Sequence, residues 1–201
     1  MSLDAPALTL ADLHDRHERA RVLDSETAFE GRVWDVRRDT VDLGHTEVVR
    51  EYVAHTGAVA VLAVREDRGE PEIFLIQQYR HPIGAHDWEI PAGLLDVEGE
   101  APELTAAREL AEEADLVADH LEQLVAHTPS PGGLDETITV YLATGLSDVP
   151  QDARHEREDE EAGMPCGWVP LSVAVDAVLA GQVRNGPMML AVLALHARRR
   201  P

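Results

Sequence analysis

Three glutamates lie on one side of a strongly predicted helix, and their spacing suits a hard divalent cation. At 100° per residue, Glu109, Glu112 and Glu113 share a patch on the helix predicted from about Pro102 to Ala114. The opposite arc contains Leu104, Ala106, Ala107, Leu110, Ala111 and Ala114. Glu109 and Glu113 repel each other in an isolated helix, whereas Mg²⁺ or Mn²⁺ attracts several carboxylate oxygens. A solvated glutamate-rich face is the alternative interpretation of this helix alone.

The residues before the helix make the pattern more specific. Gly93, Glu100 and the run Arg108 to Leu116 together resemble the signature of the Nudix hydrolases, G-x5-E-x7-R-E-U-x-E-E-x-G-U. This chain departs from the signature in two places. Six residues instead of five separate Gly93 from Glu100, and Asp115 stands where the family has glycine. Aspartate can adopt the left-handed conformation expected just past a helix end, and neither departure removes a carboxylate of the signature.

The resemblance implies metal-dependent hydrolysis of a nucleoside diphosphate linked to another group. The implied metal ligands are Glu109, Glu113, Glu112 (directly or through water) and the backbone carbonyl of Ala92. The cofactor would be Mg²⁺, with Mn²⁺ as an alternative, since such cations neutralise a diphosphate and lower the pKa of bound water. Glu100 and Arg108 would orient the carboxylates, and Arg108 and Glu112 count as catalytic residues. A surface salt bridge between Arg108 and Glu112 is the simpler alternative.

Segments outside the signature narrow the resemblance to the ADP-ribose pyrophosphatase group. These segments are REYVAHTGAVAVLAV, QQYRHPIGAHDWEIPAG and SPGGLDETITVYLA, and Pro131 follows Leu116 at about the group's usual distance. The implied reaction converts ADP-ribose to AMP and ribose 5-phosphate. The alternatives are a pyrophosphatase for another nucleoside diphosphate sugar, such as GDP-mannose or ADP-glucose, and a regulator that binds ADP-ribose without cleaving it.

The same resemblance implies a general base on a loop. In this group a loop glutamate deprotonates the attacking water, which loop closure can position away from bulk solvent. The matching segment here is HEREDEE, in which Glu160 is the first choice, followed by Glu161 and Glu158. A merely solvated acidic loop is the alternative.

Five residues match positions that line the substrate site in relatives: Arg50, Glu51, Arg80, Glu136 and Gly93. An arginine offers a planar fork to phosphate oxygens, and Glu136 offers acceptors to ribose hydroxyls. Each arginine alone is equally compatible with a surface position, and Glu136 with capping of a turn. Trp34 and Tyr79 are candidates for stacking on the base, although a buried aromatic is favoured for both.

The elements around these residues predict an α+β (mixed α/β) fold. We expect strands near RVLDSETAF, GRVWDVRRDTVDL, HTEVVREYVAH, GAVAVLAV, EIFLIQQY, LEQLVAH, ETITVYLA and CGWVP, with two further helices at about 171–180 and 187–200. The resemblance implies a Nudix-type α/β/α sandwich preceded by an antiparallel strand meander. We expect residues 1–55 to form this N-terminal region, which contributes to a homodimer, and residues 56–201 to form the catalytic domain.

Composition excludes several other functions. The 201 residues have a net charge of −21, with 38 acidic residues against 17 arginines and no lysine. Such a chain is a poor partner for nucleic acid or anionic lipid, which require a basic surface. Cys166 is the only cysteine, the chain contains no apolar run of membrane-spanning length, and its start lacks the features of a signal peptide. We therefore expect a cytoplasmic protein that acts on a small molecule.

Overall fold

The computed structural model describes residues 3–67, 69–156 and 163–200. It divides into two compact units, Met1–Val53 and Ala54–Pro201. The base candidates Glu158, Glu160 and Glu161 lie outside the described residues.

The N-terminal unit is built around a three-stranded sheet. Its strands are β1 (Arg21–Phe29), β2 (Asp35–Asp42) and β3 (Glu47–Ala54), in the spatial order β1-β2-β3, and β1 runs antiparallel to β2. Arg38 on β2 links the outer strands through Glu26 at 2.8 Å and Glu51 at 2.7 Å. Every residue of β1 is exposed within this unit. The predicted N-terminal strands are thus confirmed.

The second unit contains a seven-stranded mixed sheet with the order β10-β5-β4-β9-β8. Its strands are β4 (Ala58–Arg65), β5 (Glu72–Arg80), β6 (Ala85–Glu89), β7 (Ala92–Leu94), β8 (Leu116–His127), β9 (Ile138–Asp148) and β10 (Cys166–Pro170). β6 extends the sheet beside β5, and β7 pairs with the first half of β4. β4 and β9 are parallel, whereas β10 with β5, β4 with β5 and β7, β5 with β6, and β8 with β9 pair antiparallel. Short 3-10 turns occupy His81–Ile83 and Gln151–Ala153.

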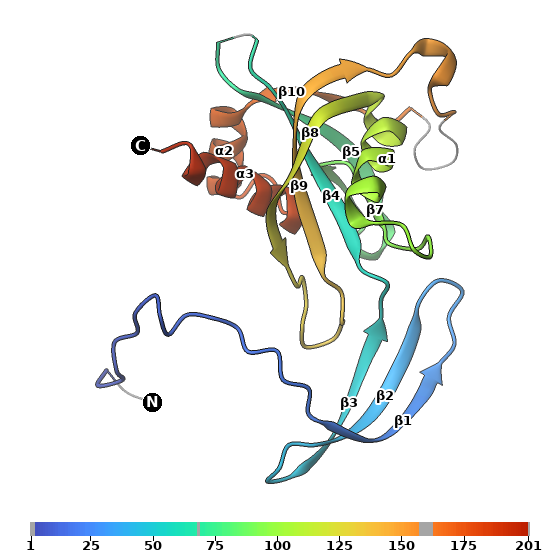
Figure 1. Cartoon of the computed structure of the whole chain (residues 1–201), viewed down its shortest axis with the longest axis vertical. Helices are drawn as coiled ribbons and strands as arrows, with labels where there is room; N and C mark the ends of the chain where they lie inside the picture. The colour runs from blue at the N-terminus through green and yellow to red at the C-terminus, as the bar shows by residue number, and fades with distance from the viewer. Residues whose placement is uncertain (1–2, 68, 157–162, 201) are drawn as a thin grey trace. The chain divides into compact units, whose positions relative to one another are not determined.

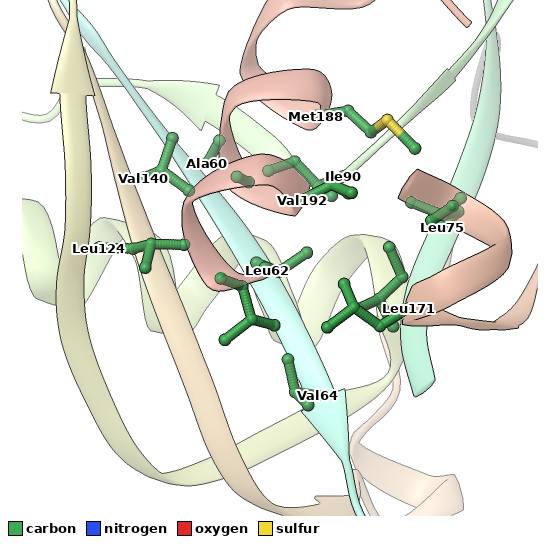
Figure 2. Close-up of a cluster of buried hydrophobic side chains, with 14 of the residues drawn as sticks. Ala60, Leu62, Val64, Leu75, Ile90, Leu124, Val140, Leu171, Met188 and Val192 are labelled. Carbon is green, nitrogen blue, oxygen red and sulfur yellow. The ribbon is translucent and has the colours of Figure 1, made fainter. Parts of the chain in front are cut away.

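Helices cover both faces of this sheet (Figure 1). α1 (Pro102–Ala114) lies on one face, and α2 (Leu171–Leu179) and α3 (Gly186–Arg198) lie on the other. β4 is central to both layers because successive side chains of a strand point to opposite faces. Ala58, Ala60, Leu62 and Val64 pack toward α2 and α3, as Figure 2 shows for three of them, and Val59, Val61 and Ala63 pack toward α1. The predicted α+β sandwich is therefore confirmed.

Two parts of the sheet differ from the sequence prediction. The passage 81–99, in which no strand was expected, contains β6 and β7, and β8 begins at Leu116 instead of near Leu121. Both segments are short or polar, so their local pattern does not indicate a strand. Pairing supplies the reason for their extended conformation, since β7 bonds to β4 and the start of β8 bonds to the end of β9.

Candidate active site

Helix α1 begins and ends as the sequence predicts. Pro102 occupies its first turn, where the missing N–H costs nothing, after Ala101 in an extended conformation. Asp115 ends the helix with φ 55° and ψ 33°, and its N–H donates to the carbonyls of Ala111 and Leu110. Among the described residues it is the only non-glycine with a positive φ. The expected left-handed aspartate is thus confirmed.

The buried stripe of α1 does not follow the predicted apolar arc. Leu104, assigned to that arc, is 62% exposed, and Ala107 is exposed as well. The buried positions are Thr105, Ala106, Glu109, Leu110, Glu113 and Ala114. The stripe is rotated by roughly a quarter of a turn toward the carboxylates. The cause is β7, which packs along this side of the helix and covers side chains that hydropathy alone assigns to solvent.

Gly93 explains how Glu109 comes to be buried. Glu109 is only 9% exposed, and its side chain lies directly against the backbone of β7. A Cβ atom placed on Gly93 would lie 2.1 Å from both Cδ and Oε1 of Glu109, which is far inside van der Waals contact. The glycine of the signature is therefore required for a close approach between this strand and the helix carboxylate, and not for a turn.

Ala92, the residue before Gly93, binds a second carboxylate of α1, that of Glu113. Glu113 is 7% exposed, and its Oε2 accepts a hydrogen bond of 2.8 Å from the backbone N–H of Ala92. The structure thus brings together Ala92, Gly93, Glu109 and Glu113, which lie in two separate segments of the sequence. Burial of a carboxylate is costly unless it has a polar partner; the N–H of Ala92 is that partner for Glu113, and Arg108 is that partner for Glu109.

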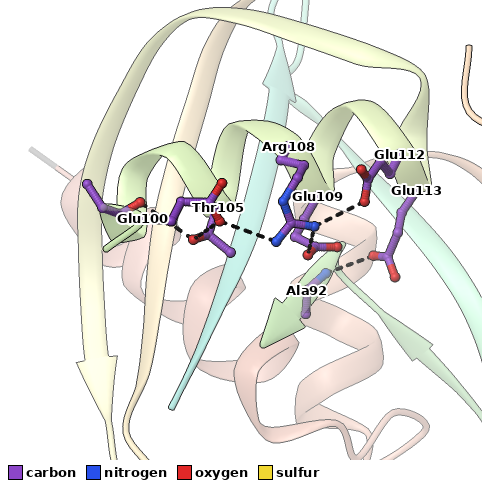
Figure 3. Close-up of polar contacts among 8 residues, drawn as sticks. Ala92, Glu100, Thr105, Arg108, Glu109, Glu112 and Glu113 are labelled. Atoms are coloured by element: carbon purple, nitrogen blue, oxygen red, sulfur yellow. Dashed lines mark hydrogen bonds and ion pairs between the residues drawn. The ribbon is translucent and has the colours of Figure 1, made fainter. Parts of the chain in front are cut away.

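Arg108 lies among the other carboxylates (Figure 3). Its Nη1 donates to Oε1 of Glu109 at 2.6 Å and to Oε2 of Glu112 at 3.1 Å, while Nη2 donates to Oε2 of Glu100 at 3.4 Å. Burial, the largest single influence, favours the neutral form, but the carboxylates of Glu109, Glu100 and Glu112 outweigh it and raise the pKa of Arg108. The predicted pair with Glu112 is present as part of this larger network.

The donor chemistry of this cluster fits a hard divalent cation. Three carboxylates contact the guanidinium of Arg108, and Glu113 adds a fourth on the same helix, so the negative charges outnumber the positive one. Oxygen donors of this kind suit Mg²⁺ and Mn²⁺. Within the described ranges, no three histidine, cysteine, aspartate or glutamate side chains converge on a point that could hold a metal ion.

The predicted substrate residues of the second unit have partners of their own. Arg80 donates from Nε and Nη2 to both oxygens of Glu89, at 2.8 and 2.7 Å, and Glu89 is only 3% exposed. Sequence reasoning missed Glu89; its signal is an acidic residue between Trp88 and Ile90 in an otherwise apolar stretch. Tyr79 is exposed, at variance with the buried position favoured for it, and its ring lies near those of His81 and His86.

Glu136 is largely buried and pairs with a histidine. Its Oε1 lies 3.5 Å from Nε2 of His55, whose Nδ1 accepts from the N–H of Gly57 at 3.0 Å. Asp135 also contacts this histidine, since it accepts from the backbone N–H of His55 at 2.7 Å. Both acidic residues thus bind His55, which is distant in the sequence, Asp135 through the backbone and Glu136 through the side chain.

The remaining two predicted substrate residues lie on β3, in the N-terminal unit. Arg50 is exposed, and its Nη1 donates to the carbonyl of Val49 at 2.9 Å. Glu51 pairs with Arg38. Both side chains are exposed within their own unit, so both are accessible to a ligand.

Comparison with known proteins identifies the family of the chain. The NUDIX domain matches residues 54–191. The chain is 46% identical over 176 residues to an ADP-ribose pyrophosphatase of Mycobacterium tuberculosis, covering 87% of this chain and 82% of that protein. It is 42% identical over 141 residues to an ADP-ribose pyrophosphatase of Bacillus subtilis, covering 70% and 74%. The crystal structure of an ADP compounds hydrolase superposes with a TM-score of 0.74 at 20% identity, covering 92% of this chain and 96% of that one.

The chain belongs to the NUDIX family, as the resemblance of its signature predicted. Nudix hydrolases generally need a divalent metal, and the cluster of Glu100, Arg108, Glu109, Glu112 and Glu113 is where the family signature lies in this fold. In the part of the chain that the structure describes, none of the helices has the length and apolar character needed to cross a lipid bilayer.

Proposed function

We propose that the chain hydrolyses the diphosphate bond of ADP-ribose, giving AMP and ribose 5-phosphate, with Mg²⁺ as the cofactor and Mn²⁺ as a substitute. The observation that carries the proposal is the pair of buried carboxylates, Glu109 and Glu113, held against Gly93 and Ala92. Buried carboxylates with excess negative charge are costly in a purely structural role. Two relatives that match most of the chain are named ADP-ribose pyrophosphatases.

In this proposal the signature residues have two roles, metal binding and the orientation of the metal ligands. Glu109, Glu113, Glu112 and the carbonyl of Ala92 would hold the cation, which when bound neutralises the diphosphate and lowers the pKa of bound water. Arg108 and Glu100 orient these carboxylates through the contacts already described. The close approach of Gly93 keeps Glu109 at a defined position along β7.

Residues outside the signature would bind the rest of the substrate. The buried Glu89 fixes the orientation of the Arg80 guanidinium, a group whose planar fork suits recognition of phosphate oxygens. Glu136, aligned by His55, would accept hydrogen bonds from ribose hydroxyls. Arg50 and Glu51 would also contact the substrate, and the base would be Glu160, with Glu161 and Glu158 as alternatives.

We also propose a cytoplasmic homodimer. Every residue of β1 is exposed within its unit, which leaves one strand of a small sheet to be covered by a second copy. The exposed free thiol of Cys166 suits a reducing compartment.

Other nucleoside diphosphate sugars, such as ADP-glucose and GDP-mannose, remain the alternative substrates, because no contact of the described residues selects a base. A regulator that only binds ADP-ribose is disfavoured, since all the signature carboxylates are present and positioned.

One assay tests the proposed reaction. The purified protein would be incubated with ADP-ribose, ADP-glucose and GDP-mannose, each with Mg²⁺, with Mn²⁺ and with EDTA, and products would be separated by ion-exchange chromatography. We expect AMP from ADP-ribose at the highest rate and no product with EDTA. Faster cleavage of ADP-glucose or GDP-mannose would identify that compound as the preferred substrate in place of ADP-ribose. If none of the three is cleaved, the proposed enzymatic activity is wrong.

The base assignment needs its own comparison. Glu160→Gln should reduce turnover at least about a hundredfold, whereas Glu161→Gln and Glu158→Gln should change it by less than about threefold. If Glu161→Gln or Glu158→Gln is the damaging substitution, the base is that residue instead.

A further inference from the structure

Thr105 is a buried residue of α1 that the family signature does not include. Its exposed fraction is 0%, although threonine is neither a strong helix former nor an apolar side chain. Its Oγ1 lies 2.8 Å from Oε2 of Glu100 and 3.5 Å from the carbonyl oxygen of Ala101. A hydroxyl has one proton, and the shorter contact to a charged acceptor is the stronger bond. Thr105 therefore donates to Glu100.

This bond acts on an oxygen that Arg108 also uses (Figure 3). Oε2 of Glu100 accepts from Thr105 and, at 3.4 Å, from Nη2 of Arg108. Glu100 precedes the helix, in a segment where its backbone is not held by helical hydrogen bonding. The buried hydroxyl thus connects the carboxylate of this loop to a fixed point on α1.

Among the described residues, the guanidinium of Arg108 is held only through its two terminal nitrogens. Its Nε is buried and has no hydrogen-bond partner among the described residues. Nη2 contacts Glu100, and Nη1 contacts Glu109 and Glu112. The position of the guanidinium therefore depends on the balance between Glu100 at one end and the two signature carboxylates at the other.

We propose that Thr105 is a positioning residue that, by fixing Glu100, keeps Arg108 shared between Glu100 and the carboxylates of Glu109 and Glu112, and so leaves these carboxylates available to a divalent cation. The proposal rests on the metal-dependent function proposed above. Without the hydroxyl, Glu100 is released to solvent, Arg108 pairs more fully with Glu109 and Glu112, and the cation must compete with a stronger internal partner.

A matched pair of substitutions separates the hydroxyl from the packing of the side chain. Thr105→Val keeps the shape and removes the hydroxyl, whereas Thr105→Ser keeps the hydroxyl and removes a methyl group. Mn²⁺ binding would be measured without substrate from the electron paramagnetic resonance signal of free Mn²⁺. We expect Kd to rise about fivefold in Thr105→Val and less than about twofold in Thr105→Ser. Circular dichroism would confirm that both variants are folded.

A double-mutant cycle identifies the partner. In the Glu100→Gln background, Thr105→Val should change the Kd of Mn²⁺ by less than about twofold, because residues that act through one bond are not additive. An equal loss in the valine and serine variants, or an unchanged Kd in Thr105→Val, would overturn the proposal.

The metal titration also keeps the two proposals apart. A wild-type protein that binds Mn²⁺ but does not cleave ADP-ribose contradicts the proposed reaction, and the valine–serine difference in Kd still decides the role of Thr105. A wild-type protein that binds no Mn²⁺ contradicts both.

Discussion

The two faces of β4 are packed by helices of opposite character. Toward α2 and α3 the strand presents Ala58, Ala60, Leu62 and Val64 to a cluster made of apolar side chains. Toward α1 it presents Val59, Val61 and Ala63, and that helix buries Glu109 and Glu113 beside its apolar residues. One strand with small side chains on both sides thus supports a layer for stability and a layer that carries charge.

The difference shows how the charged layer can be maintained. Burial of carboxylates reduces stability, and like charges at i and i+4 add to the cost. The apolar layer contributes favourable burial without such costs, with Leu62, Met188 and Val192 almost fully inaccessible. Substitutions on the two faces should therefore separate stability from function.

Glu113→Gln should have the largest effect, on function alone. We expect turnover of ADP-ribose at saturating Mg²⁺ to fall at least a hundredfold, about 3 kcal/mol in activation free energy, because an amide is a poor ligand for a hard cation. The midpoint of urea unfolding should be unchanged or higher, since a buried charge is removed. Glu103→Gln, an exposed glutamate on the same helix, is the control. Turnover within threefold of wild type would remove Glu113 from the metal site.

Leu62→Ala should have the converse effect. Its side chain is fully buried in the apolar layer, so truncation should lower the free energy of unfolding by about 3 kcal/mol. Turnover per folded molecule should be retained. Leu104→Ala, at the exposed position on α1, should change the free energy of unfolding by less than about 0.5 kcal/mol. A large loss in Leu104→Ala would contradict the rotated buried stripe.

Gly93→Ala should affect both metal binding and stability, because Gly93 lies where β7 meets the charged side of α1. The added Cβ displaces the carboxylate of Glu109, and we expect the Kd for Mn²⁺ to rise about tenfold, or about 1.4 kcal/mol. Gly186→Ala, where a Cβ would meet nothing within 4 Å, is the control. Equal metal affinity in the two variants would show that Glu109 does not need its present position.

Asp115→Gly should stabilise the protein, since glycine adopts the left-handed conformation without the steric cost of a Cβ. We expect about 1 kcal/mol in the free energy of unfolding, measured by urea titration. Asp115→Asn, which removes only the charge at the negative end of the helix, should gain less. A loss of stability in Asp115→Gly would show that the aspartate side chain has a role of its own.

His127 should produce the smallest effect, a dependence of stability on pH. Burial lowers the pKa of His127, and the carboxylate of Glu136 only partly opposes this. Because the folded state disfavours the protonated ring, its contribution is fully present above the ordinary pKa of about 6.5 and is lost as pH falls below it. The urea midpoint should therefore fall less between pH 7.5 and 5.5 in His127→Gln than in wild type. If the urea midpoint falls equally in the two proteins, His127 is not a source of the pH dependence of stability.

The local sequence pattern was sufficient to predict many of the secondary-structure elements and the family signature. Helix α1, its end at Asp115 and most strands follow from periodicity and from residues with strong backbone preferences. The signature was recognisable because its charged residues are adjacent or at fixed spacing on one helix. These properties depend on residues close together in the sequence, so they can be predicted without knowledge of the tertiary structure.

Only the tertiary structure decided which side of α1 is buried and what holds the carboxylates there. Hydropathy placed Leu104 inside and Glu109 outside, and β7, a three-residue strand without a local signal, reversed both by pairing with β4. The bonds from Ala92 to Glu113 and from Arg80 to Glu89 likewise join separate segments. Such contacts arise from the packing of strands against helices, and the conformational preference of any single segment does not contain them.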